Sequence, residues 1–365
     1  MKVNTIGLNS VRLNTIALNH IGEIRSGGGG SKPSPIPQWI REHVVFYYDV
    51  KKQGATNETL KESAYLQDLS GKGRRMKLNN FLFAEMSGVG GYNDNFSNWR
   101  TDSNNGVVKI ESDSSIVIQS VKIEYRGALY QDSSKKATLK CNITGITEEL
   151  KGKLIFRYTD AEGGKNITLE NGYFEFNSSE HEGLSGWYGF TSKQPIDNCN
   201  ITITQIPEYP GALVTDGVGD YGLVENLSSG VKMLFMTVNP MMLDRCLYDQ
   251  RKNSSSIWAF AIVCFNETIA YNSRNTDGKT YINGVLNESQ TSNEFQNKEQ
   301  IITIVNSKVN ETNSLPPNFF SVIGGSLYMK CAFYNSIAFD SIPTEADGFT
   351  EQELIDYVLT NIIGQ

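Results

Sequence analysis

The run Val44-Val45-Phe46-Tyr47-Tyr48, residues 44–48, contains only β-branched and aromatic residues, the types that favour β-strands. Between this run and later ones of the same kind lie Asn-Gly pairs such as Asn171-Gly172 and Asn283-Gly284, which are typical of tight hairpin turns. The later runs cover residues 115–118, 154–158, 173–176, 201–204, 258–263, 301–305 and 327–333. This spacing predicts an all-β protein made of sandwiches or jelly rolls.

The last residues of the sequence have the pattern of a helix instead of a strand. Thr350-Glu351-Gln352-Glu353 has the residues of a capping box, in which Thr350 and Glu353 hydrogen-bond each other's backbone N–H groups. The apolar residues that follow recur at helical spacing: Leu354, Ile355, Val358, Leu359 and Ile362. We therefore expect one C-terminal helix.

Composition argues against several classes of partner. The 365 residues include 33 Lys and Arg against 40 Asp and Glu, a net charge of −7, and no basic run occurs. Because phosphate binding needs clustered cations, we expect no nucleic-acid partner. The longest strongly apolar run, residues 257–265, has the length of a strand and falls short of the roughly 20 residues that cross a bilayer. We expect no membrane insertion.

Motifs that would carry chemistry were tested in turn. Gly217 to Gly222 matches GxGxxG, but Leu223 to Gly230 does not continue as the helix that a dinucleotide site requires. The five cysteines are scattered and the three histidines have no ligand or triad spacing. No strand carries the alternating carboxylates that a sandwich glycosidase would use. The sequence therefore predicts no catalytic residues, no metal site, no cofactor and no enzymatic activity.

Trp187-Tyr188 is the one candidate for ligand contact. These two aromatic residues lie in Leu184-Ser185-Gly186-Trp187-Tyr188-Gly189-Phe190. Aromatic rings of this kind either form a platform for a sugar ring or lie half-buried in a sandwich. Both readings stay open from the sequence.

Residues 3–22 read VNTIGLNSVRLNTIALNHIG, four copies of aliphatic-Asn-polar-aliphatic with a period of five. This is the spacing of square β-solenoids, whose coils are stable only when stacked on neighbours. One reading is a disordered terminus. We favour an anchoring arm, residues 1–25, whose aliphatic side chains are buried on another subunit: Val3, Ile6, Leu8, Val11, Leu13, Ile16, Leu18 and Ile21.

Residues 26–37 combine a glycine-serine run with a proline-rich spacer, as a flexible linker does. The run at 26–31 is also typical of a cloning linker.

Two distant stretches resemble laminin-G/concanavalin A-like jelly rolls. The first is Val44 to Asp49 followed by Asp68-Leu69-Ser70-Gly71-Lys72-Gly73, and the second includes Thr280-Tyr281-Ile282-Asn283-Gly284-Val285. The resemblance implies a discontinuous jelly-roll domain of residues 38–102 and 207–365. Residues 103–206, which have strand runs of their own, then form an inserted β-sandwich domain.

The arm, the glycine tether and Met86-Ser87-Gly88-Val89-Gly90-Gly91-Tyr92 together are similar to virion fibre or appendage proteins of crAss-like bacteriophages that infect Bacteroides. The resemblance implies a structural virion protein, a head or tail fibre or decoration protein, assembled in the host cytoplasm. Its arm would dock on phage capsid or tail proteins. The protein would form a homo-oligomer, with a trimer favoured, and its β-domains would adhere to host or mucosal surface glycans. The alternatives are a glycan-active hydrolase or depolymerase on the same fold and a bacterial surface lectin.

Overall fold

The structure, a computed structural model, divides the chain into two compact units. The first unit comprises the described parts of Met1–Phe83, Ser87–Val89 and Gly211–Gln365, and the second comprises those of Ala84–Met86 and Gly90–Pro210. The described residues are 37–122, 127–227, 230–242, 245–250, 261–265, 268–271, 278–287, 296–306, 316–321, 325–348 and 350–363. The predicted arm and nearly all of the linker lie outside them.

Each unit contains two antiparallel sheets, which confirms the all-β prediction. In the first unit, the larger sheet, here the β17 sheet, runs in the order β22-β21-β23-β17-β25-β15-β4, and β1 also pairs with β25. Its strands are β1 (Val44–Asp49), β4 (Gly88–Val89), β15 (Leu213–Val214), β17 (Met233–Pro240), β21 (Lys279–Ile282), β22 (Val285–Leu286), β23 (Gln300–Val305) and β25 (Cys331–Phe339).

The second sheet of this unit, the β16 sheet, runs in the order β2-β3-β16-β24-β18-β19-β20. Its strands are β2 (Tyr65–Leu66), β3 (Met76–Asn79), β16 (Tyr221–Val224), β18 (Arg245–Asp249), β19 (Ala261–Phe265), β20 (Thr268–Tyr271) and β24 (Asn318–Phe319).

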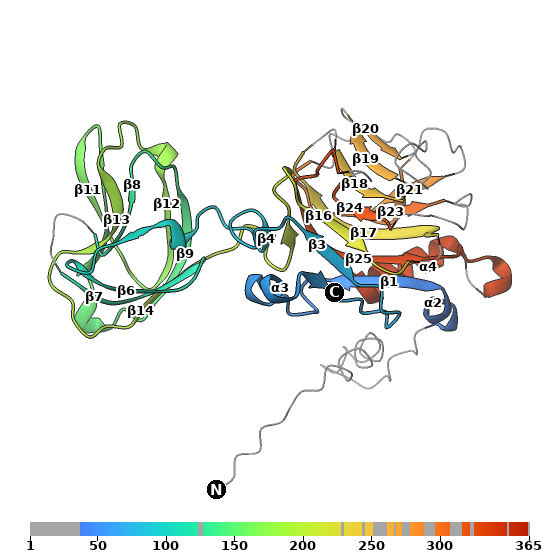
Figure 1. The fold of residues 1–365 in the computed structure, drawn as a ribbon, viewed down its shortest axis with the longest axis horizontal. Helices are drawn as coiled ribbons and strands as arrows, with labels where there is room; N and C mark the ends of the chain where they lie inside the picture. The colour runs from blue at the N-terminus through green and yellow to red at the C-terminus, as the bar shows by residue number, and fades with distance from the viewer. Residues whose placement is uncertain are drawn as a thin grey trace, which may run out of the picture. The chain divides into compact units, whose positions relative to one another are not determined.

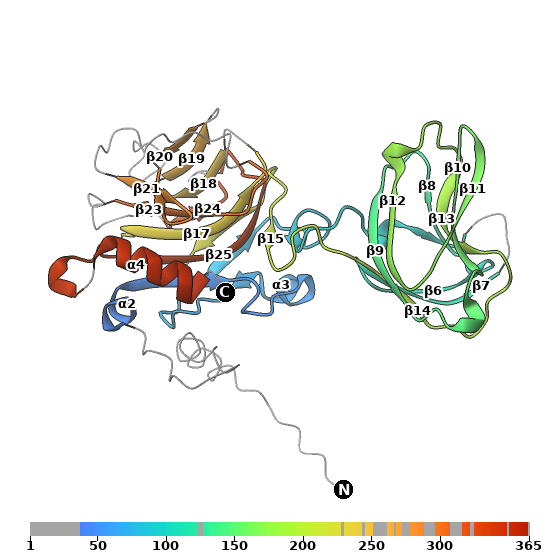
Figure 2. The same ribbon diagram turned by 180° about the vertical axis from the view of Figure 1, so that it is seen from behind.

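Three layers make up the first unit. One face of the β17 sheet packs on the β16 sheet, as Leu234 and Met236 of β17 share a core cluster with Leu78 and Phe319. The other face is covered by helices, and α4 (Glu351–Val358) lies along β25 on the side away from β18 and β19 (Figures 1 and 2). Alternate residues of one strand therefore serve two different cores, which explains why all eight residues of β17 are buried.

The predicted C-terminal helix is confirmed as α4 (Glu351–Val358), continued by the π-helical turn η5 (Leu359–Ile363). The capping box is formed, since the Thr350 N–H donates to Glu353 Oε2 at 2.7 Å and the Glu353 N–H donates to Thr350 Oγ1 at 3.3 Å. Leu354, Ile355, Val358 and Ile362 are buried against the β17 sheet, as their spacing predicts.

Two short helices were not expected. α2 (Gln38–His43) and α3 (Asn57–Ser63) have six and seven residues, too few for a periodic pattern to be visible. α3 is set by Thr56 and Thr59, which form a capping box with threonine where glutamate usually stands. The remaining helical segments are 3₁₀ turns: η1 (Phe96–Asn98), η2 (Glu148–Leu150), η3 (Ser178–Glu180) and η4 (Glu345–Asp347).

The second unit is a sandwich of two five-stranded sheets around one core cluster (Figures 1 and 2). The β10 sheet consists of β11 (Gly163–Thr168), β10 (Leu154–Asp160), β13 (Trp187–Ser192), β8 (Leu129–Asp132) and β5 (Arg100–Thr101), in that order. The β9 sheet consists of β12 (Gly172–Asn177), β9 (Thr138–Thr144), β14 (Ile201–Gln205), β7 (Ser115–Val121) and β6 (Gly106–Ser112), also in that order.

The limits of this unit differ from the 103–206 inferred from the sequence. The chain enters it at Gly90 and leaves it at Pro210. The reason is that Phe96 and Trp99 pack in its core cluster, where their rings meet Phe190.

One strand begins later than expected. The apolar run at 327–333 predicted a strand, but β25 starts at Cys331, because Leu327 adopts a left-handed φ of 52°. The predicted Asn283-Gly284 turn is confirmed: both residues have positive φ, at 51° and 83°, and they join β21 to β22. The hairpin predicted at Asn171-Gly172 is wrong, because this pair leads from β11 to β12, which belong to different sheets.

Candidate functional site

Trp187 and Tyr188, the candidate platform, point to opposite faces of β13. Tyr188 is fully buried, its ring packs against Trp99, and its hydroxyl donates to the Lys135 carbonyl at 3.0 Å. Burial raises the pKa of the Tyr188 phenol. The expectation of a two-ring platform is therefore wrong for Tyr188, because successive residues of a strand alternate between faces.

Trp187 lies on the outer face of the β10 sheet and is half-buried. Its indole meets the Tyr130 ring in an edge-to-face contact with 6.1 Å between ring centroids. Tyr130 is on β8, and its side chain is only 8% exposed, so Trp187 is the ring of this pair that a ligand can reach. The contact holds the indole in place before any ligand arrives.

Polar residues lie beside this ring pair, and Tyr130 packs over the backbone of a glycine. The ladder registers place one residue from each strand of the β10 sheet in a single row on the outer face. Near its centre stands Gly189, where an added Cβ would lie 2.3 Å from the Leu129 carbonyl oxygen. The row is Asn166, Arg157, Gly189, Tyr130 and Arg100. A partly exposed aromatic ring beside hydrogen-bonding side chains is suited to a sugar.

The opposite sheet of the same unit exposes another aromatic ring that sequence reasoning missed. Tyr173 on β12 is 63% exposed, and its hydroxyl donates to Glu175 at 2.6 Å. Nearby, Lys140 pairs with Glu208 at 2.7 Å. The alternation of Tyr173 and Glu175 with the buried Phe174 and Phe176 was the available signal.

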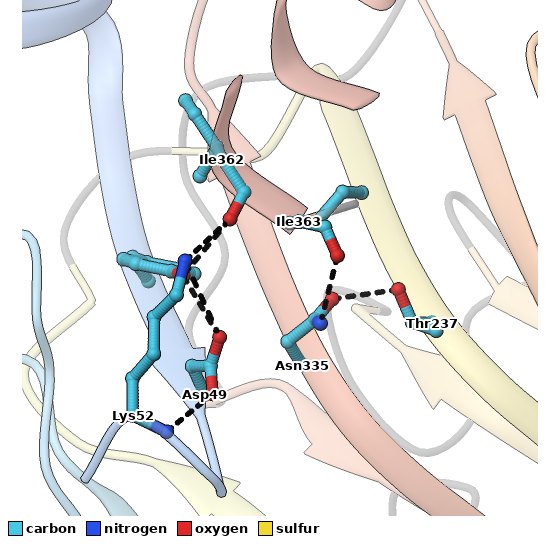
Figure 3. Close-up of polar contacts among 7 residues, drawn as sticks. Asp49, Lys52, Thr237, Asn335, Ile362 and Ile363 are labelled. Atoms are coloured by element: carbon cyan, nitrogen blue, oxygen red, sulfur yellow. Dashed lines mark hydrogen bonds and ion pairs between the residues drawn. The ribbon is translucent and has the colours of Figure 1, made fainter. Parts of the chain in front are cut away.

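A buried polar cluster in the first unit was also examined for chemistry (Figure 3). The Lys52 ammonium donates to the Tyr47 hydroxyl at 3.0 Å, and that hydroxyl donates to Asp49 Oδ2 at 3.0 Å. Burial lowers the pKa of Lys52, and burial followed by the charge of Asp49 raises the pKa of Tyr47. Such shifts also occur at catalytic centres, so the geometry must decide.

The geometry assigns this cluster to helix docking. Lys52 Nζ donates to the Ile362 carbonyl at 2.7 Å, and Asn335 Nδ2 lies 3.5 Å from the Ile363 carbonyl (Figure 3). These carbonyls end η5, where backbone acceptors lack partners within the helix and the dipole favours a cation. Two further hydrogen bonds hold these side chains in place. Thr237 Oγ1 donates to Asn335 Oδ1 at 2.7 Å, and the Lys52 backbone N–H donates to Asp49 Oδ1 at 2.7 Å. The cluster anchors the C-terminal helix to the β17 sheet.

Asp220, at the end of the β15–β16 loop, is a fully buried carboxyl group. Its Oδ2 accepts the Asp216 N–H at 2.9 Å, whereas its Oδ1 has no hydrogen-bond partner among the described residues. Burial raises the pKa of the Asp220 carboxyl to about 7, although hydrogen bonds from Asp216 and Ser87 oppose the shift. This loop is the GxGxxG segment, and it continues into strand β16 rather than into a helix.

We expect Asp220 to make the stability of the first unit depend on pH. The folded carboxyl binds its proton more tightly than the unfolded one, so its contribution is complete below pH ~4 and is lost as the pH rises through ~7. Asp220→Asn should therefore reduce the loss of stability of the first unit between pH ~4 and pH ~7. It should also raise the melting temperature at pH 8 by a few degrees. Thermal melts from pH 4 to pH 8 test this, with the exposed Asp356→Asn as control. An unchanged slope in Asp220→Asn would contradict it.

Within the described ranges, no group of three or more His, Cys, Asp or Glu side chains is arranged to hold a metal ion. No helix in that part of the chain combines the length and the apolar character needed to cross a bilayer. Cys141, Cys246 and Cys331 are buried free thiols, and Cys199 is partly buried.

Comparison with known proteins finds no family model, curated protein or solved structure that matches this chain. The eight aliphatic residues of the arm lie outside the described residues. The candidate site therefore rests on the outer face of the β10 sheet around Trp187, referred to below as the Trp187 face: Arg100, Tyr130, Arg157, Asn166, Trp187 and Gly189.

Proposed function

We propose that this protein is a non-catalytic adhesin that binds surface glycans through the Trp187 face of its second unit. The observation that carries the proposal is the Trp187 ring, held by Tyr130 on the outer face of a sheet whose other side is the core. Sugar rings present apolar C–H faces to aromatic rings and hydroxyl groups to neighbouring polar side chains, and this face offers both.

The setting we propose is a phage particle, on which the N-terminal arm anchors the protein. The support comes from the five-residue period of residues 3–22 and from the glycine-rich tether that follows. An adhesin that is displayed in many copies gains avidity, so weak individual sugar contacts suffice. A homotrimer remains our preferred assembly.

Replacing Trp187 by alanine is expected to weaken glycan binding by about tenfold or more, since about 1.4 kcal/mol corresponds to a factor of ten. A glycan array identifies ligands for the purified full chain, and titration calorimetry then compares the variants. Tyr173→Ala is the matched control, because it removes an exposed aromatic ring from the opposite sheet of the same unit. Circular dichroism checks that both variants are folded.

If Tyr173→Ala loses glycan binding while Trp187→Ala binds fully, the site lies on the β9 sheet and the proposal is overturned. The same incubations are assayed for reducing ends. Their release by the purified protein would favour the alternative, a glycan hydrolase.

A further inference from the structure

Arg157 occupies the centre of β10 on the Trp187 face. It is directly opposite Gly189 on one side and Asn166 on the other. Trp187 lies two residues before Gly189, which makes it a diagonal neighbour of Arg157 at roughly 7–8 Å between backbones. The two side chains share this face of the sheet, with the Trp187 indole against Tyr130 on β8 and the Arg157 guanidinium beside Gly164 on β11.

Arg157 as a residue is half-buried, and its guanidinium makes no hydrogen bond or ion pair with any described residue. Some other described cations are paired, such as Arg75 with Glu225 at 3.3 Å and Lys165 with Glu162 at 2.7 Å. A guanidinium has five N–H donors, and the nitrogens of Arg157 are not among the buried atoms that lack a partner, so solvent and an anion can reach them. This unused capacity is the first sign of an anion subsite.

The second sign is the space around the side chain. Gly164 leaves bare backbone on the neighbouring strand β11, and a Cβ added there would lie 3.8 Å from Arg157 Nη2 with no other atom within 4 Å. On the other side, Gly189 is covered by Tyr130, whose Cβ would lie 2.8 Å from an added Cβ. The guanidinium thus lies over an exposed glycine. A planar anion can approach its two parallel N–H groups from outside.

The carboxylate of Asp132, on the same outer face, is already compensated. Asp132, opposite Trp187 on β8, accepts the Ser134 N–H at 2.9 Å. That bond and the Ser134 side chain lower the pKa of Asp132, and Arg100 and Lys135 lower it further. Asp132 is on the side of Trp187 away from β10, so it does not occupy the Arg157 guanidinium.

We propose that Arg157 and Trp187 form one subsite for an acidic sugar. The pyranose ring stacks on Trp187, and its carboxylate accepts two parallel N–H groups from Arg157. This inference rests on the proposed function and specifies its ligand class as uronic-acid-containing glycans.

The test uses the full chain and three probes: a galacturonate oligosaccharide, its neutral methyl ester, and a sulfated galactan oligosaccharide. Calorimetry should show the galacturonate binding about tenfold more tightly than the ester, with the sulfated probe in between because sulfate is not planar. Arg157→Gln should abolish this preference while leaving the weaker binding of the ester. Arg157→Lys should keep only part of the preference for the acid, because an ammonium group has the positive charge but lacks the two parallel N–H groups of a guanidinium.

Lys136→Gln is the charge-matched control, since Lys136 is exposed on the β8–β9 turn, and it should leave all three affinities unchanged. Equal binding of acid and ester that still depends on Trp187 would overturn the acidic subsite and leave the proposed function standing. Binding of neither probe, together with an array on which no glycan depends on Trp187, would overturn both. A preference for the sulfated probe that is lost in Arg157→Gln would reassign the anion to sulfate.

Discussion

Deletion of residues 1–25 is expected to leave both units folded and to remove the protein from assembled particles. The arm has eight aliphatic side chains that a segment of this length cannot cover by itself. Buried on a particle or on sister arms at about 1.5 kcal/mol each, they contribute on the order of 10 kcal/mol. Ordering the backbone consumes much of that, so docking needs several arms acting together.

The measurement is immunodetection of the truncated protein in purified particles, with circular dichroism and a thermal melt to establish folding. A finer variant replaces only Ile6, Val11, Ile16 and Ile21 by serine, which keeps the length of the arm. Its matched control changes the polar residues Thr5, Ser10 and Thr15 to alanine and should still assemble. Normal incorporation of the truncated protein would show that residues 1–25 are a dispensable tail.

Replacement of residues 91–210 by a four-residue Gly-Ser turn is expected to abolish glycan binding while the first unit still unfolds cooperatively. The physical reason is the way the chain leaves and re-enters that unit. β4 and β15 are antiparallel neighbours with Val89 opposite Leu213, at a Cα separation of about 5 Å, so a short turn can close them. The first unit also has two core clusters of its own.

Denaturant unfolding and calorimetry measure this outcome. The control is the full chain with the same four residues inserted between Pro210 and Gly211, which should unfold in both units and bind glycan. If the shortened protein has no cooperative transition, the first unit depends on residues 91–210. If it still binds glycan as the full chain does, the Trp187 face is not the site.

Local signals were reliable where neighbouring residues in the sequence also interact in the fold. The capping box of α4 needs only Thr350 and Glu353, three positions apart, and the Asn283-Gly284 turn needs only two residues with positive φ. Leu327 shows the limit of such signals. The apolar run at 327–333 predicted a strand that begins at Leu327, but the backbone turns at this residue. β25 begins at Cys331 and continues through Tyr334, Asn335 and Ser336.

The sequence by itself determined the all-β class, the Asn283-Gly284 hairpin turn and the C-terminal helix, because these depend on backbone preferences and on patterns within a few residues. Only the tertiary structure decided which of Trp187 and Tyr188 is accessible, since alternation makes the two differ but does not say which face is the core. It also decided that Lys52 meets the carbonyl of Ile362, and that Arg157 is flanked by Gly189 and Asn166. Those neighbours come from strands and turns far apart in the chain, and they are brought together by ladder register and by the burial of apolar side chains.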